Sequence, residues 1–406
     1  MCAAESIFDD KMTKRAHHDD DAELLALSPK SARSSVGFGD IMGHMSPDAS
    51  IGDFTALQRI ILSANGNLQR LVSSYYNSPV RVVTRKCQEV EQTEGRSDFE
   101  REVELHVFGR VFAIAKSKVR LTRSELIRAV GERGVAIGQL FRQLNVMPTF
   151  ELRDAGFLPP AALVDGAERA PLFFRQYELS SEGIACNIRE EIRADLFELA
   201  PAVQLRASET GGSVTEVPNG RADGSAADEH DANEQGASSP PTLGDIMEPN
   251  RTFLQLPAGF SPLQRLMLTA NGNVQRVLSS YFGRPLHLVV TLNQKREGPI
   301  YDRRAILLLG GRQLMVASTT VFLTDPAWAE AADRHAHELG ALFHHFAELP
   351  TFTLHSTGRA PDYFWRQYRL RASGMTCEIN ETFPLNLFDE DETAGTELCG
   401  TEFGAM

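Results

Sequence analysis

The sequence has little that would indicate a metal-binding, redox-active or membrane-spanning protein. Its five cysteines include no Cys-x-x-Cys pair, the spacing typical of structural zinc sites and thiol–disulfide enzymes. No apolar run reaches the roughly 18 residues needed to cross a bilayer. The first residues also lack the apolar core of a secretory signal. We therefore expect a reduced, soluble, cytoplasmic protein with no metal, no other cofactor and no membrane partner.

The net charge of −13 comes from three segments that are poor in large apolar residues. Residues 206–243 hold seven acidic and two basic side chains, which gives −5, and residues 389–406 hold six acidic side chains and no basic ones, which gives −6. Residues 1–38, with seven acidic and five basic side chains, supply the remaining −2. The acidity therefore says nothing about what the rest of the chain binds, and no charge pattern favours a nucleic-acid partner.

A long internal repeat is the most informative feature that is present. The segment LQRIILSANGNLQRLVSSYYNSP, residues 57–79, returns without a gap as LQRLMLTANGNVQRVLSSYFGRP, residues 263–285. Shorter matches accompany it: GDIM occurs twice, PTFEL answers PTFTL, and FFRQYEL answers FWRQYRL. Each copy spans about 150 residues, the usual size of a domain with its own core and much longer than a solenoid unit.

The repeat divides the chain into five segments. Residues 39–205 and 244–388 form the two copies. Residues 206–243 have the composition of a disordered acidic linker, residues 1–38 that of a disordered N-terminal segment, and residues 389–406 form an acidic tail. We expect the two copies to be able to pack together as an intramolecular pseudo-dimer.

The apolar spacing predicts an α+β fold with antiparallel strands in each copy. Each copy begins with two short helices, and in copy 1 Gly66 can end the first helix while Asn67 caps the second. The other predicted elements are a strand, a β-hairpin whose turn looks one residue longer in copy 1, a long helix and a terminal hairpin. Their ranges are 80–83, 101–121, 123–144 and 173–188 in copy 1, and 286–292, 303–323, 327–349 and 363–379 in copy 2.

Most of the potential metal ligands have a simpler interpretation. Cys186 and Cys377 share one position on an apolar strand of the two copies, which is typical of small buried side chains rather than redox or metal groups. Copy 2 alone carries four histidines on its long predicted helix: His335, His337, His344 and His345. Without a carboxylate in a known metal motif, they do not favour a metal site.

Two kinds of charged residue recur at equivalent places in the copies. Glu190 and Glu381 lie near the ends of the terminal apolar strands. A single such glutamate is usually solvated, but its recurrence among different neighbours favours a role. Arg101 and Arg304 begin the first strand of the preceding hairpin, where exposed arginines are common.

These residues carry a resemblance to a known family. The arginine before Ile-Leu-Leu-Leu, the Leu-Gly step in the late helix and the terminal hairpin around Arg369-Leu370 and Ser373-Gly374 resemble chorismate pyruvate-lyase. The Ala-Asn-Gly-Asn corner is similar to the Ala-Asn-Gly-Thr segment of that family's mycobacterial-type branch. The resemblance covers each copy, from about residue 57 to 197 and from 263 to 388. It implies a chorismate lyase-like fold: an antiparallel sheet with helices on one face and an enclosed ligand.

The resemblance also implies site residues. In copy 2, Arg304 matches the arginine that holds the substrate carboxylate, Leu339 the pocket leucine and Glu381 the active-site glutamate. The matching residues of copy 1 are Arg101, Ile137 and Glu190. Because Arg303 adjoins Arg304, the position of the arginine is uncertain by one residue.

Those residue types suit the reaction of that family. A planar guanidinium can grip one carboxylate of a small anionic substrate through two hydrogen bonds. Elimination of pyruvate from chorismate to give 4-hydroxybenzoate requires orientation of the substrate and a polar group near the ring, and no metal. The resemblance therefore implies a carbon–oxygen lyase.

Copy 2 keeps the family pattern better, because Glu381 is followed by Thr-Phe-Pro, whereas Glu190 is followed by Glu191, Ile192 and Arg193. Two other functions stay open. One is a non-catalytic binder of a small carboxylate with the same fold, or an enzyme of specialised metabolism with another substrate. The other is a scaffold, which would leave the recurrence of the arginine and the glutamate unexplained.

Overall fold

The computed structural model of the chain describes residues 35–36, 51–131, 140–141, 148–158, 171–201, 244–248, 251–271, 274–334, 342–343, 345–346 and 348–389. The expected linker at 206–243 lies outside these residues, as do nearly all of the expected N-terminal segment at 1–38 and of the tail at 389–406. Ile137 and Leu339 also lie outside them.

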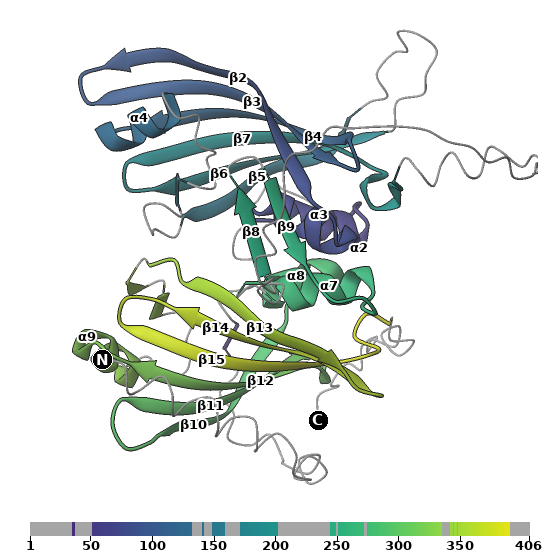
Figure 1. Ribbon diagram of the computed structural model, residues 1–406, viewed down its shortest axis with the longest axis vertical. Helices are drawn as coiled ribbons and strands as arrows, with labels where there is room; N and C mark the ends of the chain where they lie inside the picture. Colours follow the sequence, from purple (N-terminus) through teal and green to yellow (C-terminus); the bar gives the residue numbers. More distant parts are fainter. Residues whose placement is uncertain are drawn as a thin grey trace, which may run out of the picture.

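Copy 1 is built on an antiparallel sheet of eight strands in the order β5-β6-β7-β4-β3-β2-β9-β8 (Figure 1). Six of the strands belong to the copy itself: β2 (Val80–Thr93), β3 (Arg96–Val107), β4 (Arg110–Leu121), β5 (Thr149–Leu158), β6 (Leu172–Ser181) and β7 (Ile184–Arg193). The other two, β8 (Gly244–Glu248) and β9 (Arg251–Gln255), come from the start of copy 2.

Copy 2 repeats this architecture in a sheet with the order β1-β10-β11-β12-β15-β14-β13. Its own strands are β10 (His287–Lys295), β11 (Ile300–Leu309), β12 (Arg312–Leu323), β13 (Thr351–Arg359), β14 (Tyr363–Arg371) and β15 (Met375–Pro384). The seventh strand, β1 (Ser35–Val36), precedes copy 1 in the chain. The expected antiparallel α+β fold with two domains is thus confirmed.

Each sheet includes strands from the other half of the chain, β8 and β9 in the sheet of copy 1 and β1 in the sheet of copy 2. Strand β9 pairs with β2 at Thr252 and Val80, and β1 pairs with β10 at Val36 and His287. The exchange places residues 244–248 and 251–255 of the second repeat in the sheet of the first.

The central hairpins correct one expectation. Strand β3 joins β4 through Phe108-Gly109, and β11 joins β12 through Gly310-Gly311, so both turns have two residues. All four turn residues have positive φ, which is the backbone of the two-residue turn that matches strand twist. The expectation of a longer turn in copy 1 is wrong, because the two hairpins keep the same register.

The exchanged strands β1, β8 and β9 were not predicted, and neither were β5 and β13. Strands β5 and β13 pair with β6 and β14 at the edges of the sheets, and each begins at the Thr of a repeated Pro-Thr-Phe segment. The predicted long helices are described only in part, as α4 (Ser124–Gly131) and α9 (Pro326–Arg334). Within the described residues, each helix is too short or too polar to span a membrane.

A layer of four helices separates the two sheets (Figure 1). Copy 1 supplies α2 (Ala56–Leu62) and α3 (Leu68–Tyr76), and copy 2 supplies α7 (Pro262–Thr269) and α8 (Val274–Phe282). Helix α2 ends at Leu62 with Ser63 as a right-handed C-cap, so the prediction that Gly66 ends this helix is wrong; Gly66, with φ 77, turns the chain between the two helices. Asn67 occupies the N-cap position of α3, but its side chain makes no capping hydrogen bond there.

The two copies pack through these helices, which confirms the intramolecular pseudo-dimer. Arg59 Nε of copy 1 donates to the carbonyl of Ser280 at 2.8 Å, and Arg265 Nε of copy 2 donates to the carbonyl of Ser74 at 3.0 Å. Both carbonyls lie near the C-terminal end of a helix of the other copy, where carbonyls lack intrahelical partners and carry partial negative charge. The arginines of the two LQR repeats thus bind across the interface.

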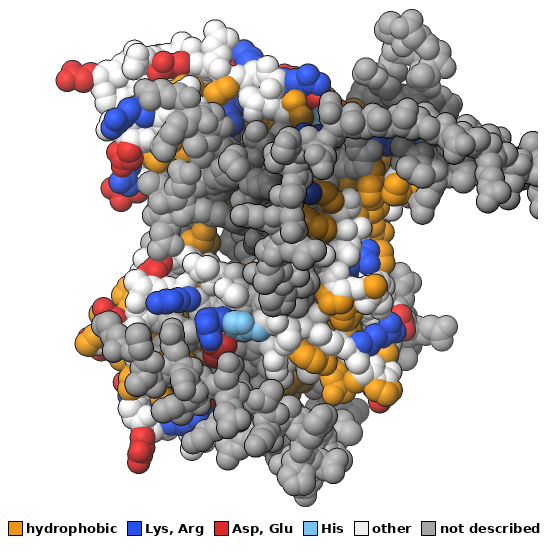
Figure 2. All heavy atoms as spheres, viewed as in Figure 1, with side chains coloured by type: hydrophobic (Ala, Val, Ile, Leu, Met, Phe, Trp, Pro, Cys, Tyr) orange, Lys and Arg blue, Asp and Glu red, His pale blue; other side chains and the backbone are white. Residues whose placement is uncertain are grey.

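The visible surface carries charges of both signs. On the face shown in Figure 2, basic and acidic side chains are interspersed over both copies. No large area of one sign covers the described part of that face.

Candidate functional site

Glu190 is a buried carboxylate whose two oxygens both have protein partners. Its Oε2 accepts a hydrogen bond from Nε of Arg175 at 2.7 Å, and its Oε1 accepts one from the hydroxyl of Tyr177 at 2.9 Å. Arg175 lies directly opposite Glu190 on the neighbouring strand β6. We call Arg175, Tyr177 and Glu190 the Arg–Tyr–Glu cluster of copy 1.

Arg175 also joins the sheet to the helix corner. Its side chain is fully buried, and Nη1 donates to the carbonyls of Ile61 at 2.6 Å, Leu62 at 3.2 Å and Ala64 at 2.5 Å. These carbonyls lie at the C-terminal end of α2 and just beyond it, and the guanidinium provides the hydrogen bonds that the helix cannot. Burial lowers the pKa of Arg175 and the charge of Glu190 raises it; the net shift is upward, so the guanidinium stays protonated.

Copy 2 contains the same arrangement. Nε of Arg366 donates to Glu381 at 2.7 Å, and the hydroxyl of Tyr368 donates to Glu381 at 2.8 Å. Nη1 of Arg366 donates to the carbonyls of Leu268, at 3.2 Å, and Ala270. Arg366, Tyr368 and Glu381 form the Arg–Tyr–Glu cluster of copy 2.

The equivalence of the two glutamates is confirmed by the strand register. Glu190 lies opposite Ala115 and Glu381 opposite Ala317, at the same position of matching strands. The arginine and tyrosine of each cluster were missed in the sequence, although both belong to the repeated Phe-x-Arg-Gln-Tyr segment. The repetition of this segment was the sequence feature that could have pointed to the arginine and the tyrosine.

The register corrects the arginine of copy 2. Arg101 lies opposite Ser117, two residues along β4 from Ala115. The equivalent position of copy 2 lies opposite Thr319, two residues along β12 from Ala317, and it holds Arg303. Arg101 and Arg303 are buried, at 5% and 9% exposure, whereas Arg304 lies on the opposite face of β11. The assignment of Arg304 as the equivalent of Arg101 is therefore wrong. Because the two hairpin turns have the same length, the equivalent residue on the inner face is Arg303.

The buried arginine and glutamate of each copy share the inner face of the sheet. Arg101 on β3 and Glu190 on β7 are separated by β4, and they are offset by two residues along the strands. With strands about 4.8 Å apart and about 3.4 Å per residue, their backbones are roughly 12 Å apart. Long side chains from the two positions can thus approach the same small ligand. Among the described residues, Nε of Arg101 has no hydrogen-bond partner.

The two recurring cysteines are buried, as predicted from the sequence. Cys186 and Cys377 are 0% and 1% exposed. Burial raises the pKa of each thiol to about 12, although the charges of Arg101 and Arg303 act in the opposite direction. Neutral thiols of this kind are poor nucleophiles.

The charges that follow Glu190 in copy 1 do not reach it. Glu191 lies on the outer face and pairs with Arg189 at 3.4 Å, and Arg193 pairs with Asp195 at 2.6 Å. Glu102 and Glu104 also lie on the face opposite Arg101, as strand alternation predicts. The sequence difference that favoured copy 2 therefore leaves the cluster of copy 1 complete.

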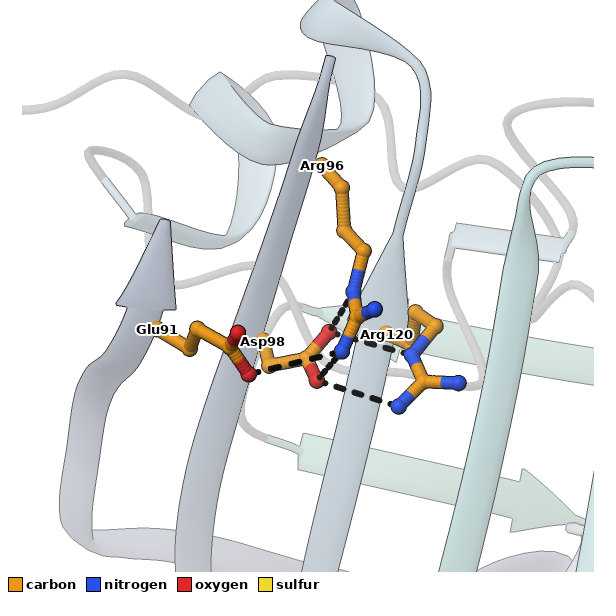
Figure 3. Close-up of polar contacts among 4 residues, drawn as sticks. All are labelled: Glu91, Arg96, Asp98 and Arg120. Atoms are coloured by element: carbon orange, nitrogen blue, oxygen red, sulfur yellow. Dashed lines mark hydrogen bonds and ion pairs between the residues drawn. The ribbon is translucent and has the colours of Figure 1, made fainter. Parts of the chain in front are cut away.

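Copy 1 differs from copy 2 in an ion-pair cluster on its outer face (Figure 3). Its members are Glu91, Arg96, Asp98 and Arg120. Asp98 accepts hydrogen bonds from Nε of Arg96 at 3.0 Å and Nε of Arg120 at 3.2 Å, and these two partners hold its pKa well below the usual range. At the positions of Asp98 and Arg120, copy 2 has the facing pair Ile300 and Phe322. Partly exposed ion pairs contribute little stability, and this cluster is remote from the inner face.

No group of His, Cys, Asp and Glu within the described residues could hold a metal ion. Of the four histidines on the long predicted helix of copy 2, only His345 is among those residues. Ile137 and Leu339, the expected pocket residues, cannot be placed relative to the clusters for the same reason.

Two comparisons of the sequence with known proteins find no match. No protein-family model matches the sequence, and no curated protein does either. The resemblance to chorismate pyruvate-lyase thus supports a proposal only.

Proposed function

We propose that the chain is a chorismate pyruvate-lyase-like enzyme that eliminates pyruvate from chorismate, or from a similar small carboxylate. The product would be 4-hydroxybenzoate or a related compound. One observation carries the proposal: in both copies, a buried arginine and a buried glutamate lie on the same inner face of the sheet, at the same positions. The antiparallel sheet with helices on one face also agrees with the chorismate lyase-like fold that the resemblance implies.

The proposed role of Arg101 and Arg303 is to hold the substrate carboxylate. A buried guanidinium costs several kcal/mol of desolvation unless an anion and hydrogen bonds compensate it. Nε of Arg101 has no such bond among the described residues, and a carboxylate ligand would provide it. Because arginine binds a carboxylate through two parallel hydrogen bonds, the contact would also orient the ring of the ligand.

The reaction requires little covalent chemistry from the protein. The bond between the ring carbon and the enolpyruvyl oxygen breaks, and the ring loses the proton on the carbon that must become aromatic. The proton passes to the departing enolpyruvate, which becomes pyruvate, so no oxidant, reductant or metal enters the balance. The protein has to hold the substrate so that the leaving group and the proton are suitably oriented.

Glu190 and Glu381 would act as fixed polar groups beside the ring. Each carboxylate is held from two sides, by Arg175 and Tyr177 or by Arg366 and Tyr368. A preorganised carboxylate can accept a hydrogen bond from the ring substituent without reorganisation during the reaction.

The same contacts favour a second candidate, a non-catalytic protein that binds a small carboxylate. A glutamate with both oxygens engaged is well suited to structure and less suited to proton transfer. In this case the two inner faces would bind the anion and leave it unchanged.

Incubation of the purified full chain with chorismate separates the candidates. Chromatography should show 4-hydroxybenzoate and pyruvate in equal amounts, at a rate above that of the double variant Arg101→Ala/Arg303→Ala. Binding of chorismate without turnover would support the second candidate. Neither turnover nor binding of chorismate or 4-hydroxybenzoate would refute both.

A further inference from the structure

Two further arginines lie buried where the copies meet. Arg70 on α3 and Arg276 on α8 are the arginines of the repeated Gln-Arg pair that follows the helix corner. Their exposures are only 4% and 8%. Unlike Arg59 and Arg265, which bind carbonyls near the ends of α8 and α3, they extend toward the Arg–Tyr–Glu cluster of the other copy.

Arg70 of copy 1 binds the helix end that supports the cluster of copy 2. Its Nη2 donates to the carbonyl of Thr269 at 3.1 Å. The carbonyls immediately before and after it, those of Leu268 and Ala270, accept hydrogen bonds from Arg366. Arginines from the two copies therefore bind three consecutive carbonyls at the C-terminal end of α7.

Arg276 of copy 2 reaches the cluster of copy 1 by another route. Its guanidinium carbon lies 5.5 Å from the centre of the Phe150 ring, within the range of a cation–π contact. The Phe150 ring lies 5.5 Å from that of Tyr177, whose hydroxyl donates to Glu190. The chain of contacts runs from a helix of copy 2 to the glutamate of copy 1.

These contacts can fix the position of each cluster. Two desolvated cations at one helix end, Arg70 and Arg366, are compatible because the end of a helix carries partial negative charge and several unpaired carbonyls. Removing Arg70 would leave the carbonyl of Thr269 without this donor, and Arg366 already binds the carbonyls on either side of it. A shift of Arg366 toward it would move Glu381 as well.

We propose that Arg70 and Arg276 are positioning residues that act across the interface, each fixing the Arg–Tyr–Glu cluster of the other copy. Each carboxylate-binding site would then need the opposite copy to be complete, which gives the tandem arrangement a function. The inference rests on the proposed function, since it concerns the same two sites.

Single-site backgrounds allow each copy to be tested alone in the full chain. Arg303→Ala should disable the site of copy 2, so that binding of 4-hydroxybenzoate reports copy 1, and Arg101→Ala should do the reverse. In the Arg303→Ala background, Arg276→Ala should raise the Kd at least tenfold, whereas Arg70→Ala should change it less than twofold. In the Arg101→Ala background the two effects should be exchanged.

Arg59→Ala and Arg265→Ala are matched controls, because each removes an interface arginine that does not reach a cluster. Both should leave the Kd within about twofold in either background. Equal losses from Arg276→Ala and Arg265→Ala would assign Arg276 to interface stability alone. A loss in the site of its own copy would also overturn the inference.

Amide hydrogen exchange tests the same inference without a ligand. Arg276→Ala should speed exchange in residues 172–193 of copy 1 more than in residues 363–384 of copy 2, and Arg70→Ala should do the opposite. If wild-type protein binds no 4-hydroxybenzoate, the proposed function fails and this exchange pattern still decides the inference. Faster exchange only in the variant's own copy would contradict it.

Discussion

The buried glutamates show how one residue can join three elements. Glu190 holds Arg175, and Arg175 holds the carbonyls at the end of α2. Glu190 itself could be noticed in the sequence because Glu381 recurs at the matching position. Arg175 could not be assigned a role, since its partner Ile61 lies 114 residues earlier in the chain, and only the fold brings the two together.

Replacing Glu190 by Gln should strongly destabilise the protein. The change keeps the shape but leaves the guanidinium of Arg175 buried without its anion, and breaking such a pair costs about 3–5 kcal/mol. Its neighbour Glu191 pairs on the outer face with partial exposure, so Glu191→Gln should cost less than about 0.5 kcal/mol. Urea unfolding measures both values, and similar losses from the two variants would contradict the structural account.

The buried thiols should be protected from alkylation. Cys87 is exposed, whereas Cys186 and Cys377 are buried, so iodoacetamide at neutral pH should label Cys87 and spare the other two until the protein unfolds. Peptide mass spectrometry measures the labelling. Rapid modification of Cys186 or Cys377 in folded protein would show that these strands are accessible.

The same thiols predict the direction of a pH effect. Burial raises the pKa of Cys186 and Cys377 from 9.0 to about 12, so folding favours the neutral thiol. Their contribution to stability is present below pH 9 and is lost as the pH rises toward 12. In Cys186→Ala/Cys377→Ala, the free energy of unfolding should therefore fall less over this range than in wild-type protein.

At the scale of elements, the register of the strands was the hardest feature to predict. The Gly310-Gly311 turn between two β-rich runs made the hairpin of copy 2 recognisable. The choice between Arg303 and Arg304 depended on the length of the turn in copy 1. Phe108-Gly109 could not be recognised as a two-residue turn, because phenylalanine rarely adopts positive φ. A shift of one residue moves a side chain to the other face of a sheet. The error in turn length therefore placed Arg304, in place of Arg303, at the site.

The helix corner should depend on Gly66. This residue has φ 77, and an added Cβ would lie 3.1 Å from Cδ1 of Leu179. Gly95 has φ 76 with open space around it, so Gly95→Ala should cost only the backbone strain of about 1–2 kcal/mol. Gly66→Ala should cost more, because it adds a steric contact beneath α2. Thermal unfolding compares the two, and an equal loss would show that the corner tolerates the methyl group.

For the molecule as a whole, the interface between the copies accounts for the best-preserved part of the repeat. A two-fold interface uses the same surface of both partners, so the same residues are required on each side. Arg59 and Arg265 meet this requirement, because each binds the end of the helix that follows the one carrying the other arginine. The sequence showed the identity of these segments, but the polar LQR residues gave no sign that they lie in an interface.

The interface should hold the copies together without the linker. If a specific protease site is inserted within residues 206–243 and cut, the two halves should elute from a sizing column as one species in native buffer. The exchanged strand β9 and the four-helix layer both oppose separation. The Arg59→Ala/Arg265→Ala variant should separate more readily after cutting, and immediate separation of the wild-type halves would contradict the packing.

Calorimetric titration with 4-hydroxybenzoate tests the central claim, that each copy binds a small carboxylate through its inner-face arginine. Wild-type protein should bind two molecules, Arg101→Ala and Arg303→Ala one each, and the double variant none. The loss of a charge-assisted contact should weaken each altered site roughly ten- to hundredfold. Arg304→Ala is the matched control, because Arg304 lies on the opposite face and its removal should leave both sites intact. Unchanged binding in the double variant, or an equal loss from Arg304→Ala, would contradict the account.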